Sequence, residues 1–285
     1  MVNLNGKIIS VEKGNVSINN RGLQYGDAVF ETLKVVATRI NFWEDHYFRL
    51  MASMRILRME IPMTFSMEFL EKEILKTIEA SNLSSETCRV KFYVNRKEGG
   101  KYTPTSNDVD YFIAIEKLEI PFYTMDDAPY EVELFKDYYV YSNLLSTLKT
   151  NSRTVNVLGS IFAHENGYQN CLLLNENKMI VEALQGNLFL VKGNTIITPP
   201  ITDGCLRGII RKQLIAICKQ SKEYTLEEKS ISPFDLQKAD ELFITNVIMG
   251  IQPITKYRKK EFTNKVSKEL LQKLNMNARL SSGSN

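Results

Sequence analysis

The stretch that most constrains the fold is residues 28–37, which reads Ala-Val-Phe-Glu-Thr-Leu-Lys-Val-Val-Ala. β-branched and aromatic residues dominate it, which is typical of a strand. Residues 39–43 follow closely and predict its antiparallel partner. Helices are predicted over 44–59 and 66–81; in the second, Met67, Leu70, Ile74 and Ile78 form one apolar stripe at helical spacing. Strands followed by a helix pair predict an α+β fold.

Four further runs in the first part read as strands: residues 7–10, 15–18, 89–95 and 111–116. Residues 118–129 contain two prolines and two aspartates and predict a connector between domains. The sequence therefore predicts a smaller N-terminal α+β domain over 1–120 and a larger C-terminal domain over 121–285.

The second part alternates between helical and strand-like patterns. Strands are predicted over residues 171–174, 179–182, 187–191, 195–198 and 241–245, and helices over 154–167, 206–220 and 263–276, with a short helix beginning at Ser232-Pro233.

Composition excludes several classes of function. Of 285 residues, 44% are hydrophobic and 24% charged, as in an ordinary globular protein, and the net charge of +3 comes without a basic stripe, so no nucleic-acid role is expected. No run is long and apolar enough for a membrane span, and no signal peptide is evident at the N-terminus. Four dispersed cysteines without a CxxC pair predict reduced thiols in a cytoplasmic protein, and with two histidines no metal site is expected.

Six short motifs carry the chemical information, and their order along the chain matters more than any one of them. They are Gln24-Tyr25-Gly26-Asp27-Ala28-Val29-Phe30-Glu31, His46-Tyr47-Phe48-Arg49-Leu50, Ser146-Thr147-Leu148-Lys149-Thr150-Asn151-Ser152, Val181-Glu182-Ala183-Leu184-Gln185-Gly186-Asn187-Leu188-Phe189, Thr198-Pro199-Pro200 with Gly204-Cys205-Leu206-Arg207-Gly208-Ile209-Ile210-Arg211, and Ala239-Asp240-Glu241-Leu242-Phe243.

This series resembles the class IV, or fold-type IV, pyridoxal-phosphate-dependent aminotransferases, which include branched-chain and D-amino acid aminotransferases and aminodeoxychorismate lyases. The resemblance covers nearly the whole chain. It implies a small N-terminal α+β domain, a larger barrel-like C-terminal α/β domain, pyridoxal 5'-phosphate as cofactor and a homodimer. It also implies that Lys149 forms the Schiff base and moves the substrate proton, and that Glu182 pairs with the pyridine nitrogen.

The phosphate of the cofactor needs charge and oriented N–H donors. The resemblance assigns Arg49 to it, together with Gly208, Ile209 and Ile210 at a helix start and the Asn246-Val247 turn. The chain departs from the branched-chain pattern where Ile210 and Val247 replace common threonines, so backbone groups and Asn246 are expected to carry more of the binding. The tyrosine that often follows the lysine by five residues is Thr154 here.

For the substrate, the resemblance places aromatic walls at Tyr25 and Phe30. Arg89, Arg96 and Lys101 flank the turn at Gly99-Gly100. Either one of them faces a substrate carboxylate, with Arg89 and Arg96 as the candidates, or the segment is a solvated hairpin. His46 and His164 are expected to be structural, packing within helices.

Three activities fit these motifs. The first is transamination between an amino acid and a keto acid, as in the branched-chain enzymes. The second is an aminodeoxychorismate lyase that releases pyruvate and 4-aminobenzoate, favoured by the Thr245-Asn246-Val247-Ile248-Met249-Gly250 loop and the residues after Arg96. The third is a catalytically silent relative with a binding role, against which the retention of Lys149 and Glu182 argues.

Overall fold

The computed structural model describes residues 1–126 and 128–280 and divides the chain into two compact units. The N-terminal unit holds Met1–Pro121, Lys149–Ser152 and residues 278–280. The C-terminal unit holds Phe122–Leu148 and Arg153–Asn277. None of the helices in these described ranges is long and apolar enough to cross a bilayer.

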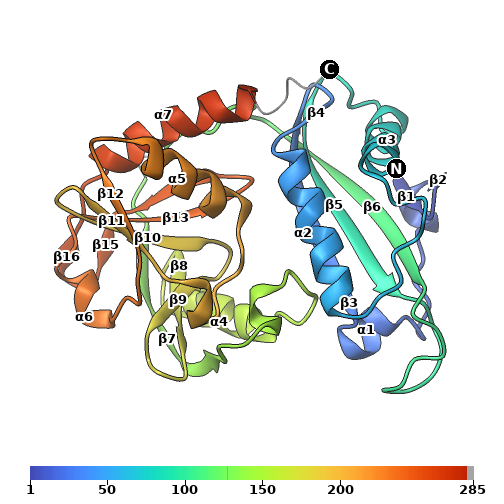
Figure 1. Cartoon of the computed structure of the whole chain (residues 1–285), viewed down its shortest axis with the longest axis horizontal. Helices are drawn as coiled ribbons and strands as arrows, with labels where there is room; N and C mark the ends of the chain where they lie inside the picture. Colours follow the sequence, from blue (N-terminus) through green and yellow to red (C-terminus); the bar gives the residue numbers. More distant parts are fainter. Residues whose placement is uncertain (127, 281–285) are drawn as a thin grey trace. The chain divides into compact units, whose positions relative to one another are not determined.

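The N-terminal unit is built on a six-stranded sheet in which every pairing is antiparallel, in the order β2-β1-β6-β5-β3-β4 (Figure 1). Its strands are β1 (Val2–Leu4), β2 (Lys7–Ile9), β3 (Ala28–Val36), β4 (Arg39–Ile40), β5 (Thr87–Arg96) and β6 (Val109–Leu118). The long central strands β3 and β5 pair without a break from Ala28↔Asn95 to Val36↔Thr87.

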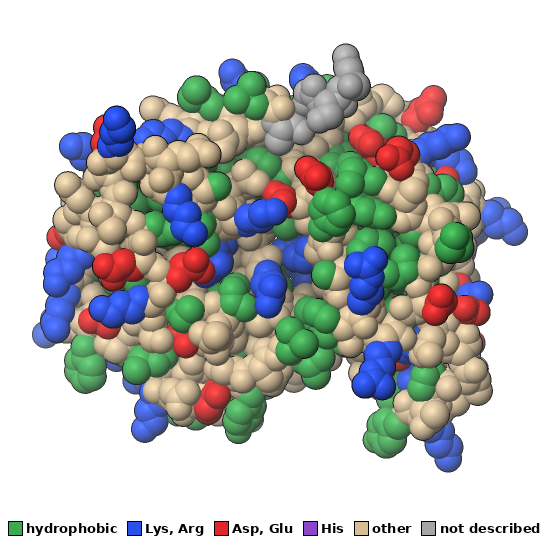
Figure 2. Space-filling model, in the orientation of Figure 1, with side chains coloured by type: hydrophobic (Ala, Val, Ile, Leu, Met, Phe, Trp, Pro, Cys, Tyr) green, Lys and Arg blue, Asp and Glu red, His purple; other side chains and the backbone are tan. Residues whose placement is uncertain are grey.

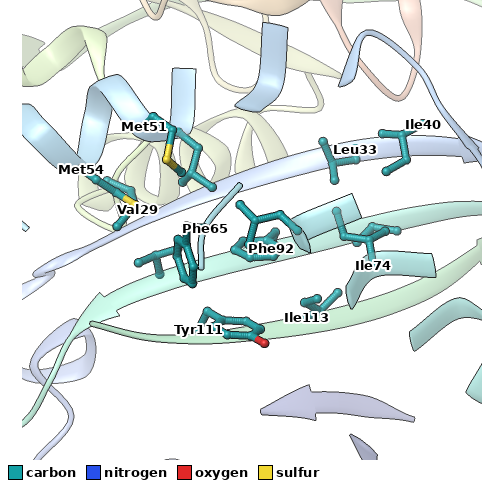
Figure 3. Packing of buried hydrophobic residues seen from close by; sticks show 14 of the residues in the cluster. Val29, Leu33, Ile40, Met51, Met54, Phe65, Ile74, Phe92, Tyr111 and Ile113 are labelled. Carbon is teal, nitrogen blue, oxygen red and sulfur yellow. The ribbon is translucent and has the colours of Figure 1, made fainter. Parts of the chain in front are cut away.

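Two long helices, α2 (Trp43–Ile56) and α3 (Met67–Ala80), cover one face of this sheet, and a short one, α1 (Arg21–Tyr25), precedes β3. Ser66 begins α3 by accepting a hydrogen bond from the Phe69 N–H at 3.2 Å. Alternate residues of β3, β5 and β6 point into the same apolar core as both helices, and Figure 3 shows Met51, Met54, Ile74, Phe92 and Ile113 packed there. The opposite face of the sheet is therefore left for other residues.

The C-terminal unit contains two five-stranded sheets, ordered β12-β11-β10-β13-β14 and β16-β15-β7-β8-β9. Both contribute to one buried core that includes Val132, Leu172, Leu188, Leu242 and Ile254. The elements are β7 (Glu131–Val140), β8 (Asn170–Asn175), β9 (Ile180–Ala183), β10 (Asn187–Lys192), β11 (Thr195–Thr198), β12 (Thr225–Glu228), β13 (Glu241–Asn246), β14 (Gly250–Ile254), β15 (Lys256–Tyr257), β16 (Lys260–Glu261), α4 (Thr154–Glu165), α5 (Ile209–Gln220), α6 (Pro233–Leu236) and α7 (Lys265–Leu280). Single 3-10 turns lie at Val11–Lys13, Leu145–Thr147 and Ile201–Asp203.

The predicted α+β class agrees with this architecture, and most predicted elements lie within a few residues of the observed ones. One predicted strand is wrong: residues 15–18 are irregular, and Val16 and Ile18 are exposed because they have no face to pack against. The ten-residue strand β7 and six short elements, β1, α1, β12, β14, β15 and β16, have no counterpart among the predicted elements.

The division also differs in detail from the sequence-based boundary at residue 120, because Lys149–Ser152 groups with the N-terminal unit rather than with the larger one. The physical reason is main-chain pairing. The Phe30 N–H donates to the Lys149 carbonyl at 2.9 Å, and the Asn151 N–H donates to the Ala28 carbonyl at 3.1 Å. The lysine segment thus pairs in antiparallel fashion with the start of β3.

Candidate active site

Lys149 is held by its backbone beside Phe30, and its amine lies over that ring. The Lys149 Nζ is 4.5 Å from the centroid of the Phe30 ring, a cation–π distance. Gly26 allows the close approach on which this segment depends. It ends α1 with a φ of +66°, and a Cβ there would come within 2.7 Å of the Ser152 Oγ. The Tyr25-Gly26 motif therefore supports the lysine segment.

Arg49 projects from α2 into a buried ionic cluster. Its Nε donates to Glu31 Oε1 at 2.8 Å and its Nη2 donates to Glu31 Oε2 at 2.5 Å, which is the bidentate arrangement of a strong pair. His46 Nδ1 lies 2.6 Å from Glu31 Oε2. Burial alone would raise the pKa of Glu31, but the charge of Arg49 and the contact with His46 outweigh it and lower the pKa to about 2.

The two candidate carboxylate-binding arginines lie in different environments. Arg96 is buried, with Nε on Asp27 Oδ2 at 2.9 Å, Nη1 on the Arg58 carbonyl at 3.0 Å and Nη2 on the Leu57 carbonyl at 2.6 Å. Asp27 also binds Arg21 at 2.9 Å. Arg96 therefore ties together the end of β5, the end of α2 and the turn before β3, and these contacts occupy all three of its nitrogens.

Arg89 lies on the sheet face opposite the helices, where Nη1 meets the exposed Glu116 at 3.3 Å. Its Nε is buried and has no hydrogen-bond partner among the described residues. The same face carries Lys91, whose Nζ lies 4.9 Å from the centroid of the Tyr93 ring and 5.4 Å from that of Phe30. This face combines positive charge with aromatic surface.

The two predicted aromatic wall residues differ in exposure. Phe30 is half-buried and its ring contacts Tyr93 at a centroid distance of 5.6 Å. Tyr25 is 39% exposed at the end of α1, between the Arg21 guanidinium at 4.9 Å and the Tyr102 ring at 5.7 Å. Phe30 is the one that lies directly beside Lys149.

In the C-terminal unit, Glu182 is a buried carboxylate on β9, 6% exposed. Its Oε2 accepts a hydrogen bond from the Leu206 N–H at 2.9 Å and from Asn187 Nδ2 at 3.4 Å. The same Asn187 nitrogen donates to the Leu206 carbonyl at 2.9 Å. Asn187 thus joins the carboxylate to the turn that leads into α5.

The start of α5 has no side-chain cap, a geometry that suits an anion. Gly208 is its N-terminal cap, no side chain caps the helix, and Ile209 and Ile210 are its first residues. A Cβ on residue 208 would overlap Asn187 Oδ1, so only glycine permits this packing. The carboxylate of Glu182 and the helix start are therefore fixed by the same asparagine.

The Asn246-Val247 turn is organised by the Asn246 side chain. Asn246 Oδ1 accepts from the Ile248 and Met249 N–H groups, each at 2.9 Å, and Nδ2 donates to the Gln185 carbonyl at 3.2 Å. The Val247 carbonyl accepts from Tyr123 Oη at 3.0 Å. The Asn246 side chain therefore holds its own loop in shape.

The predicted residues therefore form two groups. Lys149, Arg49, Phe30, Tyr25, Arg89 and Arg96 belong to the N-terminal unit; Glu182, Gly208, Ile209, Ile210, Asn246 and Val247 belong to the C-terminal unit. Glu31 and Asn187 are absent from the site residues predicted from the sequence, and His46 is predicted only as ordinary helix packing. One signal is present: Glu31 lies between Val29 and Leu33 in the alternation of β3, which places a carboxylate on an apolar face.

The surface carries both acidic and basic side chains (Figure 2). Figure 2 shows acidic and basic side chains interspersed over the visible face, in keeping with 36 basic and 33 acidic residues. Within residues 1–126 and 128–280, no group of three or more His, Cys, Asp and Glu side chains is arranged to hold a metal ion.

Comparison with known proteins gives consistent results. The profile of the family described as amino-transferase class IV matches residues 28–257. A putative branched-chain-amino-acid aminotransferase of Methanocaldococcus jannaschii is 28% identical over 271 residues, which is 95% of this chain and 92% of the relative. The aminodeoxychorismate lyase of Vibrio harveyi is 23% identical over 243 residues, which is 85% of this chain and 87% of the relative.

Among solved structures, the branched-chain aminotransferase of the archaeon Thermoproteus uzoniensis with norvaline superposes with a TM-score of 0.85 at 23% identity, covering 99% of this chain and 94% of that one. At this identity the likeness establishes the fold.

Proposed function

Because this chain belongs to the amino-transferase class IV family, we propose that it binds pyridoxal 5'-phosphate at Lys149 and transfers an amino group between an amino acid and a keto acid. The observation that carries the proposal is the link between Glu182 and the start of α5. Asn187 holds a buried carboxylate close to an uncapped helix N-terminus. The carboxylate suits a pyridine nitrogen, and the helix N-terminus suits a phosphate.

The residues fit this cofactor. When bound, pyridoxal phosphate supplies an electron sink for the bonds around the substrate Cα. Lys149 Nζ would be the amine that takes the proton from the substrate Cα and delivers it to the C4′ carbon of the cofactor, and the Phe30 ring beside it limits where that amine can lie. Glu182 would keep the pyridine nitrogen protonated, and Arg49 and the N–H groups of Ile209 and Ile210 would bind the phosphate.

For the substrate carboxylate we propose Arg89 and not Arg96. The hydrogen bonds of Arg96 to Asp27, Arg58 and Leu57 support a structural role for it. Arg89 lies on the sheet face that carries Phe30 and Tyr93. It pairs there with the exposed Glu116, and a substrate carboxylate can take the place of that side chain. Tyr25 and Phe30 are the proposed aromatic walls.

The lyase is the second candidate. The loop built on Asn246 supports it, because this side chain binds Ile248 and Met249 where branched-chain enzymes have a Gly-Thr-Ala type loop. The similarity to the Vibrio harveyi lyase over 85% of the chain also supports it. In that reaction the same lysine would move protons while pyruvate and 4-aminobenzoate are released.

We further propose that the protein is a cytoplasmic homodimer. Large exposed apolar residues of the N-terminal unit, Ile18, Leu23 and Tyr102, support an interface with a second copy. All four cysteines are buried and none forms a disulfide, which fits a reducing compartment.

A spectral titration separates the two activities. The purified protein is loaded with pyridoxal phosphate and scanned in the near-ultraviolet and visible range before and after adding L- and D-amino acids one at a time. Conversion to the pyridoxamine spectrum by one class of amino acid establishes transamination and identifies the donor. A spectrum that no amino acid changes, with pyruvate formed from aminodeoxychorismate, establishes the lyase instead.

A further inference from the structure

Glu31 is a carboxylate in an apolar core, where burying a charge costs free energy. In β3 the alternate residues Val29, Leu33 and Val35 point into the apolar core, and Glu31 shares their side of the strand at 2% exposure. A carboxylate in such a place is stable only when it is paired and fully hydrogen-bonded. Hydrogen-bonding partners, rather than packing, must therefore stabilise Glu31 at this position.

Both partners come from one face of α2. His46 and Arg49 are three residues apart, so their side chains point in the same direction. Arg49 meets both oxygens of Glu31 through one edge of its guanidinium, at 2.8 and 2.5 Å, while His46 Nδ1 meets Oε2 at 2.6 Å. The three groups form a line from His46 through Glu31 to Arg49.

His46 acts in this line as a neutral hydrogen-bond donor. It is fully buried, and its Nε2 has no hydrogen-bond partner among the described residues, so Nδ1 carries the proton and donates to Glu31. Burial lowers the pKa of His46 more strongly than Glu31 raises it. Its polar contribution is therefore to orient one oxygen of Glu31.

We propose that His46 and Glu31 are positioning residues that set the plane of the Arg49 guanidinium for the cofactor phosphate, an inference that rests on the proposed function. An arginine side chain has many rotamers, and ordering it costs conformational entropy. The bidentate contact to Glu31 holds the guanidinium in one orientation in the folded protein, so this entropy is already lost before the phosphate binds. His46 in turn prevents Glu31 from rotating.

The test compares two ligands that differ only in the phosphate. Dissociation constants of pyridoxal phosphate and of pyridoxal are measured on cofactor-free protein by absorbance or fluorescence, and their ratio reports the phosphate contact. Four single variants are compared with the wild type, Glu31→Gln, His46→Leu, His46→Asn and Arg49→Ala, together with the double variant Glu31→Gln/Arg49→Ala. Asparagine is included because its amide nitrogen can take the place of Nδ1.

The matched control is Glu73→Gln. Glu73 is another buried carboxylate of the N-terminal unit; it lies on α3 and is bound by Asn3 at 2.8 Å and Tyr111 at 3.2 Å. This variant is expected to lower the unfolding temperature and to leave the ratio unchanged. It separates general loss of stability from loss of the phosphate contact.

We expect Glu31→Gln and His46→Leu to reduce the preference for pyridoxal phosphate by about 10- to 100-fold, with the affinity for pyridoxal retained. His46→Asn should restore most of the preference, and Glu31→Gln should have little further effect when Arg49 is already alanine. Equal losses for both ligands, or an unchanged ratio in folded Glu31→Gln and His46→Leu proteins, would overturn the inference. Wild-type protein that binds neither ligand would refute the proposed function itself, and the inference with it.

Discussion

Glu182 is the residue whose surroundings say most about the chemistry. It is buried, yet one oxygen is held by the Leu206 N–H and the Asn187 amide, so hydrogen bonds from neutral groups help to stabilise its charge. Such a carboxylate can face a protonated ring nitrogen and stabilise it. The charge of Glu182, more than its size, should matter to catalysis.

Replacing Glu182 by alanine should therefore lower kcat by about 10²-fold or more while the protein stays folded, because the ring nitrogen loses its partner. Steady-state kinetics with the donor found by the spectral titration measures this. Glu227→Ala, on the exposed side of β12, is the control and should leave kcat unchanged. A Glu182→Ala enzyme with wild-type kcat would remove Glu182 from the site.

Arg89 and Arg96 should respond in opposite ways to alanine substitution. Arg96→Ala leaves Asp27 short of a partner in a buried network and should destabilise folding by about 3–5 kcal/mol. Arg89→Ala should have little effect on the unfolding temperature and raise KM for the amino acid by about 10-fold or more, because a charged hydrogen bond is lost. Thermal unfolding and initial rates measure the two effects; the reverse pattern would exchange the assigned roles.

At the scale of elements, the start of α5 tolerates little change, because Gly208 packs tightly against Asn187. Gly208→Ala should weaken pyridoxal phosphate binding by about 10-fold or more, because the new methyl group would collide with Asn187 Oδ1 and move the first turn. Gly193→Ala is the control: its φ of +57° makes it strained, but nothing lies within 4 Å of its Cβ, so only stability should change. Equal affinities of the two variants would contradict the role of this helix start.

The elements also show how far the sequence can predict the fold. Strands β3, β5 and β10 are predicted because β-branched and apolar residues make their pattern strong. Strand β7 is missed because it mixes charges and tyrosines with its buried residues, and its partners β8 and β15 lie far along the chain. The false strand at 15–18 has a strand-like pattern but no neighbour to pair with.

Only those residues of the candidate site that lie in local sequence motifs can be predicted from the sequence. Lys149, Glu182 and Arg49 stand in recognisable motifs. The contacts that decide what a residue can do are distant in sequence: Arg96 binds Asp27 from 69 residues away, and Asn246 binds Gln185 from 61 residues away. No local pattern reports such contacts, so these hydrogen bonds of Arg96 and Asn246 are visible only in three dimensions.

For the whole molecule, the cluster around Glu31 predicts how stability depends on pH. Its pKa is lowered from 4.5 to about 2 in the folded state, so folding is favoured above pH 4.5, and this contribution is lost as the pH falls toward 2. The shift corresponds to on the order of 3 kcal/mol. Urea unfolding between pH 2 and 7 should show a decline that is smaller in Glu31→Gln, and identical slopes for both proteins would contradict the pairing.

The central claim is that Lys149 holds the cofactor, and one measurement tests it directly. The protein is loaded with pyridoxal phosphate, reduced with borohydride so that the cofactor is fixed to its amine, digested and analysed by mass spectrometry. The account predicts a phosphopyridoxyl group on Lys149 and its loss in Lys149→Ala. Specific labelling of another lysine, such as the buried Lys34, or no labelling at all, would contradict the account.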